Sequence, residues 1–435
     1  MLARSVPHSE DRTSYVRWIL VAMMCVISFI SYILRTNLSI VGDRVMNDLG
    51  LTQVQLGLVL SAFAWGYTIF EFPGGILGDR IGSRKTLALA SIAWAILTVL
   101  TAMIPGRSVA SVSTILALFI VIRFLVGSTQ APLFPVIGGT IGNWFPVSSW
   151  ALPNGLTSTF LNLGAAATAP LIVWLMNISG WRGSFLLTAP LGLLGAFVWW
   201  HYVRNFPAEH PAVSQRELAL IDADRPPPVD PAEQKGAWKA VLKNRQVLLL
   251  TISYFCMNYI FYLIFNWFFI YLVNVRHVPE HQAGYLTASQ YVVGSVGATL
   301  GGFLCDRLAK RLGPRWGYRM LPIPCLLLTT VFLIAGAVVE NSYLAVAFFA
   351  ICSGLTQVTD PVYWGAIVAV SGRHAASAGG ILNTGGNAVG GIGAIIVPLI
   401  AKQFGWVAAI SSGGIFTIAA ALLWLLIRSD QTMQD

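Results

Sequence analysis

The stretch Gly74-Gly75-Ile76-Leu77-Gly78-Asp79-Arg80 has a second copy, Gly301-Gly302-Phe303-Leu304-Cys305-Asp306-Arg307, which begins 227 positions later. In both copies a long apolar segment runs into the glycine pair, and Lys and Arg residues follow. This order indicates the point where a membrane helix reaches water. One such boundary in each half predicts a duplicated membrane protein, and internal repeats of this kind are characteristic of secondary transporters.

The composition agrees with a membrane chain. Of the 435 residues, 56% are hydrophobic and 10% are charged, whereas soluble domains carry about 25% charged residues. The formal charge of +9 does not indicate a nucleic-acid partner, because the basic residues are spread over loops between apolar segments. The five cysteines lie in or beside apolar segments without metal-ligand spacing, so no metal, cofactor or disulfide framework is expected.

The apolar segments predict an all-α polytopic membrane protein, with twelve transmembrane helices in two pseudo-symmetric six-helix bundles. The helices are expected near 18–41, 54–77, 86–105, 112–140, 151–177, 183–203, 246–274, 283–305, 319–339, 343–370, 376–401 and 406–427. The predicted domains are an N-terminal tail at 1–17, a first bundle at 18–203, a proline-rich linker at 204–245, a second bundle at 246–427 and a tail at 428–435.

The loops also predict the orientation of the chain. If the N-terminus is inside, 20 Lys and Arg residues fall on the inner side and 5 on the outer side. Cytoplasmic loops carry the excess of Lys and Arg. We therefore expect an integral protein of the cell (inner) membrane, in contact with the lipid bilayer and with both termini in the cytoplasm.

Four ionisable residues lie inside predicted helices: Arg35, Glu71, Arg123 and Asp360. A charge at mid-bilayer costs at least about 2.5–3.5 kcal/mol, so such residues either pair with each other or face a functional cavity. Both readings are open for the two acids. For the arginines we favour an anion site, because neither has an acid nearby in sequence and a guanidinium binds a carboxylate in bidentate geometry.

Further polar side chains fit one lumen around these charges. Gln130 lies two helical turns after Arg123 and so on the same face. Each side chain alone is also compatible with a hydrogen bond between helices. The other candidates for substrate binding are Tyr32, Tyr67, Asn258, Tyr262, Asn266, Asn383 and Asn387.

The segment Gly75-Ile76-Leu77-Gly78-Asp79-Arg80-Ile81-Gly82-Ser83-Arg84-Lys85 resembles the cytoplasmic loop motif of the major facilitator superfamily. Within it the chain is similar to the anion:cation symporter group, which includes sugar-acid and aromatic-acid permeases and sialin. The matching pieces are Arg35-Thr36-Asn37-Leu38-Ser39, Phe72-Pro73-Gly74-Gly75 with Tyr67, Arg123-Phe124-Leu125-Val126-Gly127 and Ala131-Pro132-Leu133-Phe134-Pro135.

This resemblance implies that Arg35 and Arg123 hold a substrate carboxylate. It also implies a gating motif at the ends of the second and eighth helices, where aspartate and arginine cap helix ends or pair across the halves. Many bacterial members have acids where this chain has Leu34 and Gln130, and those acids are thought to carry the proton. The gating residues are Gly75, Asp79, Arg80, Gly82, Arg84, Asp306 and Arg307.

We therefore expect alternating-access transport of a small organic anion, such as a sugar acid or an aromatic acid, by a monomer. Proton symport through Glu71 or Asp360 is the first expectation, and anion exchange or uniport are the alternatives. A membrane-embedded sensor is a remote alternative, because 204–245 is too short for a soluble domain. An enzyme is not expected, since the six histidines lie in loops or at span ends without a nucleophile or metal pattern.

Overall fold

The computed structural model describes residues 13–146, 151–222, 241–371, 375–431 and 433. Within these ranges ten segments are helical, long and apolar enough to cross a membrane. In chain order the elements are α1 (Val16–Leu49), α2 (Gln53–Ile81), α3 (Ser83–Ala102), α4 (Val112–Gln130), α5 (Leu133–Trp144), α6 (Ala151–Tyr202), η3 (Pro207–Glu209), α7 (Gln215–Asp222), α10 (Arg245–Asn274), α11 (Glu280–Arg319), α12 (Pro322–Val338), α13 (Ser342–Ser371) and α14 (Ala375–Leu426).

Two of these elements are too long for a single crossing. α6 and α14 contain 52 residues each, which is about 78 Å of helix, whereas the hydrocarbon core of a bilayer is about 30 Å thick. Each is interrupted by a glycine with positive φ, Gly180 at 71° and Gly405 at 83°. Other residues adopt this conformation only with strain. Each element is therefore two helices joined at a glycine.

The second arm of α6 runs antiparallel to α3. Arg182 donates to the carbonyl of Ile104, just past the end of α3, and Trp199 donates to the carbonyl of Ser83 at its start. With the two arms of α6 and of α14 counted separately, the ten spans become twelve crossings, as the sequence predicts.

The predicted span 112–140 is built from two helices. α4 ends at Gln130 and α5 begins at Leu133. Pro132 lies between them, and because proline has no backbone N–H it cannot continue the hydrogen-bond ladder of α4. The two helices still form one apolar segment that is long enough to span a membrane.

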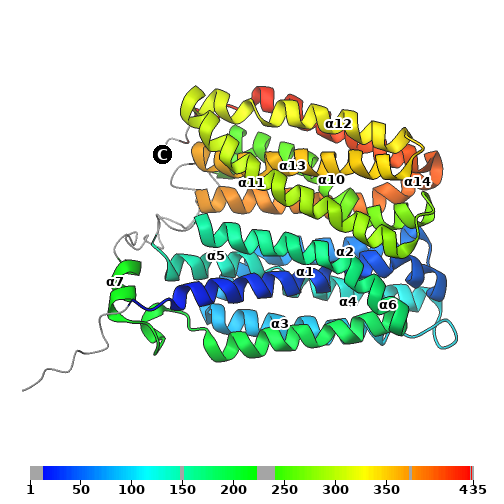
Figure 1. The fold of residues 1–435 in the computed structure, drawn as a ribbon, viewed down its shortest axis with the longest axis horizontal. Coiled ribbons are helices and arrows are strands. Elements are labelled where there is room, and N and C mark those ends of the chain that lie inside the picture. The colour runs from blue at the N-terminus through cyan, green and yellow to red at the C-terminus, as the bar shows by residue number, and fades with distance from the viewer. Residues whose placement is uncertain (1–12, 147–150, 223–240, 372–374, 432, 434–435) are drawn as a thin grey trace, which may run out of the picture.

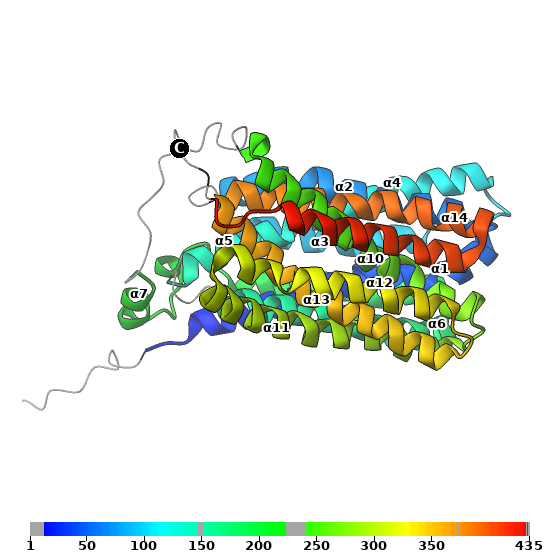
Figure 2. The same ribbon diagram turned by 90° about the horizontal axis from the view of Figure 1, so that it is seen from above.

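The helices form two bundles. α1 to α6 make the first and α10 to α14 the second, and the two are stacked one above the other in Figure 1. Figure 2 shows the same helices from above, running roughly parallel to the long axis of the molecule. Two buried apolar clusters lie within the first bundle and one within the second, while a fourth contains residues of both. The bundles therefore share part of their core.

The two bundles are tied together at one end. Near the C-terminal end of α1, Arg44 binds Glu280 of α11 with two hydrogen bonds of 2.9 and 3.0 Å, and Asn274 of α10 donates to Asp43 at 2.6 Å. At the opposite end, which holds the start of α1, none of the described hydrogen bonds joins the bundles. The described hydrogen bonds between the bundles are thus more numerous at the end that holds the C-terminus of α1 than at the opposite end.

Residues 204–222, part of the predicted linker, lie against the first bundle. The fully buried carboxylate of Glu217 accepts hydrogen bonds from Ser14 Oγ (2.5 Å) and from two backbone N–H groups at the start of α1 (3.2 Å each). Asn205 Oδ1 accepts from the backbone N–H of Arg84 at the start of α3 (3.1 Å). Acceptors at a helix N-terminus satisfy its free donors, so this segment caps two membrane helices.

Candidate functional site

Arg35 lies in the middle of α1 and is 4% exposed. Four aromatic rings surround its guanidinium carbon at 4.8 to 5.2 Å from their centroids, namely those of Phe63, Tyr67, Tyr32 and Phe265. The negative faces of such rings attract a cation, most strongly where water is absent. Tyr32 and Tyr67, both predicted site residues, therefore contact Arg35 directly.

Arg123 of α4 lies next to Arg35. It is 2% exposed, and its Nη2 donates to the backbone carbonyl of Arg35 at 3.1 Å. Its guanidinium carbon is 5.0 Å from the centroid of Phe63, the same ring that contacts Arg35. The Nε atoms of both arginines are buried without a hydrogen-bond partner. The two guanidinium groups, each with an unpaired Nε donor, therefore lie against the same ring, that of Phe63.

Neither arginine is neutralised by a carboxylate within the described chain. The ion pairs found there are Arg17–Glu217, Arg44–Glu280 and Arg182–Asp48. Among the described residues, therefore, neither Glu71 nor Asp360 forms a direct ion pair with Arg35 or Arg123. Each guanidinium therefore has an N–H group that can still donate a hydrogen bond to a bound ligand.

A chain of hydrogen bonds leads from Arg35 to Glu71. Arg35 Nη2 donates to Tyr262 Oη at 3.3 Å, and Tyr262 donates to Asn387 Oδ1 at 2.9 Å. Asn387 in turn donates to one carboxylate oxygen of Glu71 at 3.4 Å, while Asn383 donates to the other. We name these residues the relay. It connects α1 and α2 of the first bundle with α10 and α14 of the second.

Asp360 lies apart from the relay. Its Oδ1 accepts from Tyr254 Oη at 2.8 Å, and both residues belong to the second bundle. The remaining predicted side chains are also distributed: Gln130 donates to the backbone carbonyl of Ser31 at 3.2 Å, Asn258 lies beside Gly386 of α14, and Asn266 is buried in α10. The structure brings the arginines, three tyrosines, two asparagines and Glu71 together, but it leaves Asp360 in a separate cluster.

The gating motif lies at the end of the bundle that holds the start of α1. Asp79 and Arg80 are exposed, and none of the described side chains bonds to either. Arg84 is fixed instead by Trp200, whose carbonyl accepts from its Nε at 2.8 Å. In the second copy Arg307 lies over Phe303, with 5.7 Å to the ring centroid, whereas the side chain of Asp306 is outside the described part of the structure. Gly75 packs on Pro135, and Gly82 adjoins Asn205.

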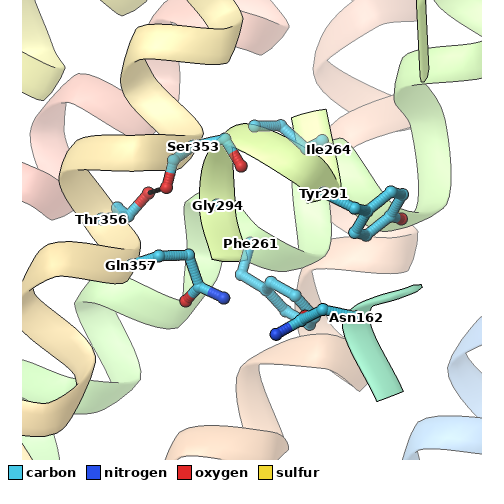
Figure 3. A pocket seen from close by; sticks show the side chains of 8 residues that line it. All are labelled: Asn162, Phe261, Ile264, Tyr291, Gly294, Ser353, Thr356 and Gln357. Atoms are coloured by element: carbon cyan, nitrogen blue, oxygen red, sulfur yellow. Dashed lines mark hydrogen bonds between the residues drawn. The ribbon is translucent and has the colours of Figure 1, made fainter. Parts of the chain in front are cut away.

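A small pocket, partly open to the outside and with free space for about one water molecule, lies at the interface of the two bundles. Figure 3 shows its lining, which comes from α6, α10, α11 and α13. Tyr291 in this lining belongs to the same buried cluster as Tyr32 and Phe265. The pocket is lined by Asn162, Phe261, Ile264, Tyr291, Gly294, Ser353, Thr356 and Gln357.

Sequence reasoning missed several of these residues. Phe63 precedes Tyr67 by four positions and Glu71 by eight, a spacing that places all three on one helix face, and this signal could have found it. Asn162 and Gln357 carry no comparable pattern in the sequence. No group of three His, Cys, Asp or Glu side chains suited to a metal is present among the described residues.

The profile of the family described as Major Facilitator Superfamily matches residues 24–321, more than half of the chain. The chain belongs to the major facilitator superfamily. Membership makes it an integral membrane transporter, so the predicted family and the predicted absence of an enzymatic function are confirmed.

Named relatives cover nearly the whole chain. The "Probable galactarate/D-glucarate transporter GudP" of Bacillus subtilis (strain 168) is 32% identical over 437 residues, 97% of this chain and 94% of that protein. The "Probable sulfoacetate transporter SauU" of Cupriavidus necator is 28% identical over 390 residues, 89% of this chain and 88% of that protein. The predicted likeness to sugar-acid permeases is thereby confirmed.

The fold has a solved counterpart. A bacterial homolog of the human lysosomal transporter Spinster, crystallised in an inward-facing and unoccupied conformation, superposes with a TM-score of 0.79 at 18% identity, covering 96% of this chain and 98% of that one. At this identity the likeness concerns the fold alone. It confirms the predicted all-helical major facilitator architecture.

Proposed function

We propose that this protein is a secondary transporter of small organic anions, and that Arg35 and Arg123 bind the carboxylate. The observation that carries the proposal is the buried arginine pair, whose Nε donors have no partner and whose charges meet no carboxylate within the described chain. The relatives, named as transporters of galactarate, glucarate and sulfoacetate, support an anionic substrate.

The physical argument is one of charge. An unpaired ion buried away from water costs several kcal/mol even after relaxation, and each cation–π contact returns only about 0.5–2 kcal/mol. A carboxylate between the two guanidiniums would supply the missing counter-charge and accept the free N–H groups. Binding of an anion therefore stabilises the closed interface, which is the property that alternating access needs.

Glu71 is our candidate for the coupled proton. Its ionised carboxylate accepts hydrogen bonds from two asparagine amides of the other bundle. Protonation turns one of these acceptor oxygens into a donor, which weakens the hydrogen bonds from the two asparagines to Glu71. Because Asn387 also bonds to Tyr262, the change alters the hydrogen bonding of Arg35 through the relay. Asp360 has no such link across the interface, so we assign it a structural role. Anion exchange and uniport, which need no titrating group, remain the alternatives to proton symport.

We place the protein in the inner membrane as a monomer with both termini in the cytoplasm, following the distribution of 20 and 5 basic residues. The tied end of the interface then faces outward. The division into tail, first bundle, linker, second bundle and tail given above is part of the same proposal.

Uptake by purified protein in proteoliposomes tests these assignments. With an inward proton gradient, wild-type protein should accumulate a sugar acid, and Arg123→Ala should lose at least 100-fold in kcat/KM. Arg107→Ala, an exposed arginine outside the site, is the matched control and should transport normally. Full activity of Arg123→Ala would overturn the anion site.

The proton route is tested separately. Glu71→Gln should abolish the stimulation by the gradient and leave exchange of internal for external anion intact. Asp360→Asn is the control and should keep the stimulation. If Glu71→Gln still accumulates anion against its gradient, Glu71 does not carry the proton.

A further inference from the structure

The chain passes from α11 into α12 through a short second arm of α11. Gly313, with a φ of 75°, interrupts the helix before this arm. A Cβ atom added at Gly317 would overlap the backbone of Ala309, so the second arm folds back against the end of the first. One apolar span ends at Gly313 and the next begins at Arg315. This turn, which Figure 1 shows in yellow-green at the same end of the molecule as α7, therefore lies where two membrane helices reach water.

Three arginines lie close together at the turn. The charges of Arg315 and of Arg428, just past the end of α14, repel that of Arg319, whereas the carboxylate of Asp430 attracts it. We name Arg315, Arg319 and Arg428 the basic cluster. Among the described residues its positive charge exceeds the negative charge beside it. The same turn also carries Arg307, Lys310 and Arg311.

The basic cluster has hydrogen-bond donors to spare. Arg315 Nε is buried and has no partner among the described residues. Arg428 is exposed. Arg319 is occupied, since its Nε (2.8 Å) and Nη2 both donate to the carbonyl of Ile427 at the end of α14. A buried donor without a partner costs free energy, so an acceptor bound at Arg315 would stabilise the turn.

Exposed apolar side chains border the basic cluster. Leu312, Trp316 and Met320 are 45%, 57% and 54% exposed. The guanidinium carbon of Arg319 lies 5.8 Å from the centroid of the Trp316 ring. Tryptophan is enriched where the acyl chains of a bilayer meet the head groups. A ligand that fits this surface therefore combines an anionic group with apolar chains.

The equivalent turn of the first bundle has its arginine covered by protein. Arg84 corresponds to Arg311 at the 227-residue spacing of the duplicated motif. Its Nε donates to the carbonyl of Trp200 at 2.8 Å, and its guanidinium carbon lies 4.6 Å from the centroid of that ring. Within the described structure no residue bonds to the side chain of Arg311 in this way. The second turn thus leaves room for a ligand where the first has a protein contact.

We propose that the basic cluster binds the phosphate group of an anionic phospholipid in the adjacent leaflet. Arg315 donates to the phosphate oxygens, Arg428 adds positive charge, and the acyl chains lie along Leu312, Trp316 and Met320. A guanidinium binds phosphate oxygens in bidentate geometry, and basic side chains beside a membrane helix attract anionic lipids. A zwitterionic lipid carries a cation of its own, which the cluster repels. The lipid site is separate from the anion site at the two buried arginines.

Native mass spectrometry of the purified protein in detergent tests the proposal. The probes are dioleoylphosphatidylglycerol, which is anionic, and dioleoylphosphatidylcholine, which is zwitterionic and has the same acyl chains. The wild-type protein should bind the first phosphatidylglycerol about tenfold more tightly than phosphatidylcholine. Arg315→Gln should weaken phosphatidylglycerol binding about tenfold, because it removes charge-assisted hydrogen bonds, and should leave phosphatidylcholine binding unchanged. Arg315→Lys keeps the charge without the bidentate geometry, so its affinity should lie between the two.

Three controls accompany these measurements. Lys85→Gln removes an exposed positive charge at the same end of the molecule but in the first bundle, and it should leave both affinities unchanged. Arg428→Gln should also weaken phosphatidylglycerol binding, and it replaces Arg315→Gln if that variant fails to fold, as judged by its melting temperature. Glycerol 3-phosphate, which has a phosphate but no acyl chains, should not displace the lipid at equal concentration.

Three results would overturn the inference. One is equal affinity of the wild-type protein for the two lipids. Another is equal weakening by Lys85→Gln and Arg315→Gln, because the effect would then be one of overall charge. The third is displacement of the lipid by an equal concentration of glycerol 3-phosphate, which would assign the basic cluster to free phosphate compounds. None of these results bears on the proposed transport, which uptake measurements test.

Discussion

Tyr262 of the second bundle accepts a hydrogen bond of 3.3 Å from Arg35 of the first bundle. The same hydroxyl donates to Asn387, so one phenol oxygen connects the cation on α1 to the amides that hold Glu71. A change at either end of the relay alters the hydrogen bonds available to the other. We propose that substrate charge and Glu71 are coupled in this way.

Removal of the Tyr262 hydroxyl should uncouple the two ends of the relay. In Tyr262→Phe the ring stays and the hydrogen bonds to Arg35 and Asn387 are lost. Because a hydrogen bond to a charged group contributes about 1.5–3 kcal/mol, we expect the KM for the anion to rise about tenfold. Stimulation of uptake by a proton gradient should also fall. Tyr259→Phe on the same helix, whose hydroxyl contacts Ser412, should leave both quantities unchanged.

Close packing of α2 on α4 should hold the arginine pair in place. A Cβ atom added at Gly127 would overlap the backbone carbonyl of Phe63, the residue whose ring contacts both arginines. Overpacking of this kind costs typically about 1–3 kcal/mol. Gly127→Ala should therefore melt several degrees lower in detergent and lose anion affinity. Gly139→Ala, which meets nothing within 4 Å, is the matched control, and equal melting of the two variants would contradict the prediction.

The pair Arg44–Glu280 should favour the state in which this end of the interface is closed. The two side chains are partly exposed, so their contribution to stability is about 1 kcal/mol or less, yet such a difference shifts a two-state population severalfold. Spin labels at Arg107 and Lys402, one on each half, should show a longer distance more often in Arg44→Glu. The charge-swapped pair Arg44→Glu with Glu280→Arg should restore the wild-type distribution. No restoration would show that the pair does not act as a latch.

His210, outside the membrane-spanning helices, should make the stability of residues 204–222 depend on pH. Burial, and then the charge of Arg204, lowers the pKa of this imidazole below its ordinary value of 6.5. The folded state therefore binds fewer protons than the unfolded state near that pH, and stability present above about pH 6.5 is lost as the pH falls.

His210→Phe should flatten this dependence. It retains a ring against Trp144 and Tyr202 and removes the titrating group. Thermal unfolding followed between pH 7.5 and pH 5.5 measures the effect, and hydrogen exchange at α7 reports it locally. Parallel curves for the variant and the wild type would show that another group is responsible.

Much of the candidate site was predictable because it depends on isolated charges in apolar helices. Arg35 and Arg123 stand out from their neighbours in the sequence, and a buried cation needs no knowledge of the fold to be noticed. The polar side chains that form hydrogen bonds around this site could not be predicted in the same way. Asn383 and Asn387 lie 312 and 316 positions after Glu71, and no local pattern indicates which polar side chain of α14 faces which helix.

The two acids in the membrane helices also show what sequence can predict and what helix packing decides. Glu71 and Asp360 are equivalent candidates in the sequence, each a single carboxylate in an apolar span. The packing of α2 on α14 brings Glu71 to the asparagines and toward Arg35, whereas the packing of α13 on α10 gives Asp360 a tyrosine of its own bundle. Helix packing thus distinguishes two residues that composition treats alike.

The sequence by itself determined the membrane class, the twelve crossings, the duplicated halves and the unusual charges, since these follow from the hydropathy and spacing of neighbouring residues. Only the tertiary structure decided that the ring of Phe63 contacts both arginines, that Tyr262 bonds to both Arg35 and Asn387, and that Asn162 and Gln357 line one pocket. The physical reason is distance along the chain: these contacts join helices far apart in sequence, and only the packing of complete helices fixes which side chains meet.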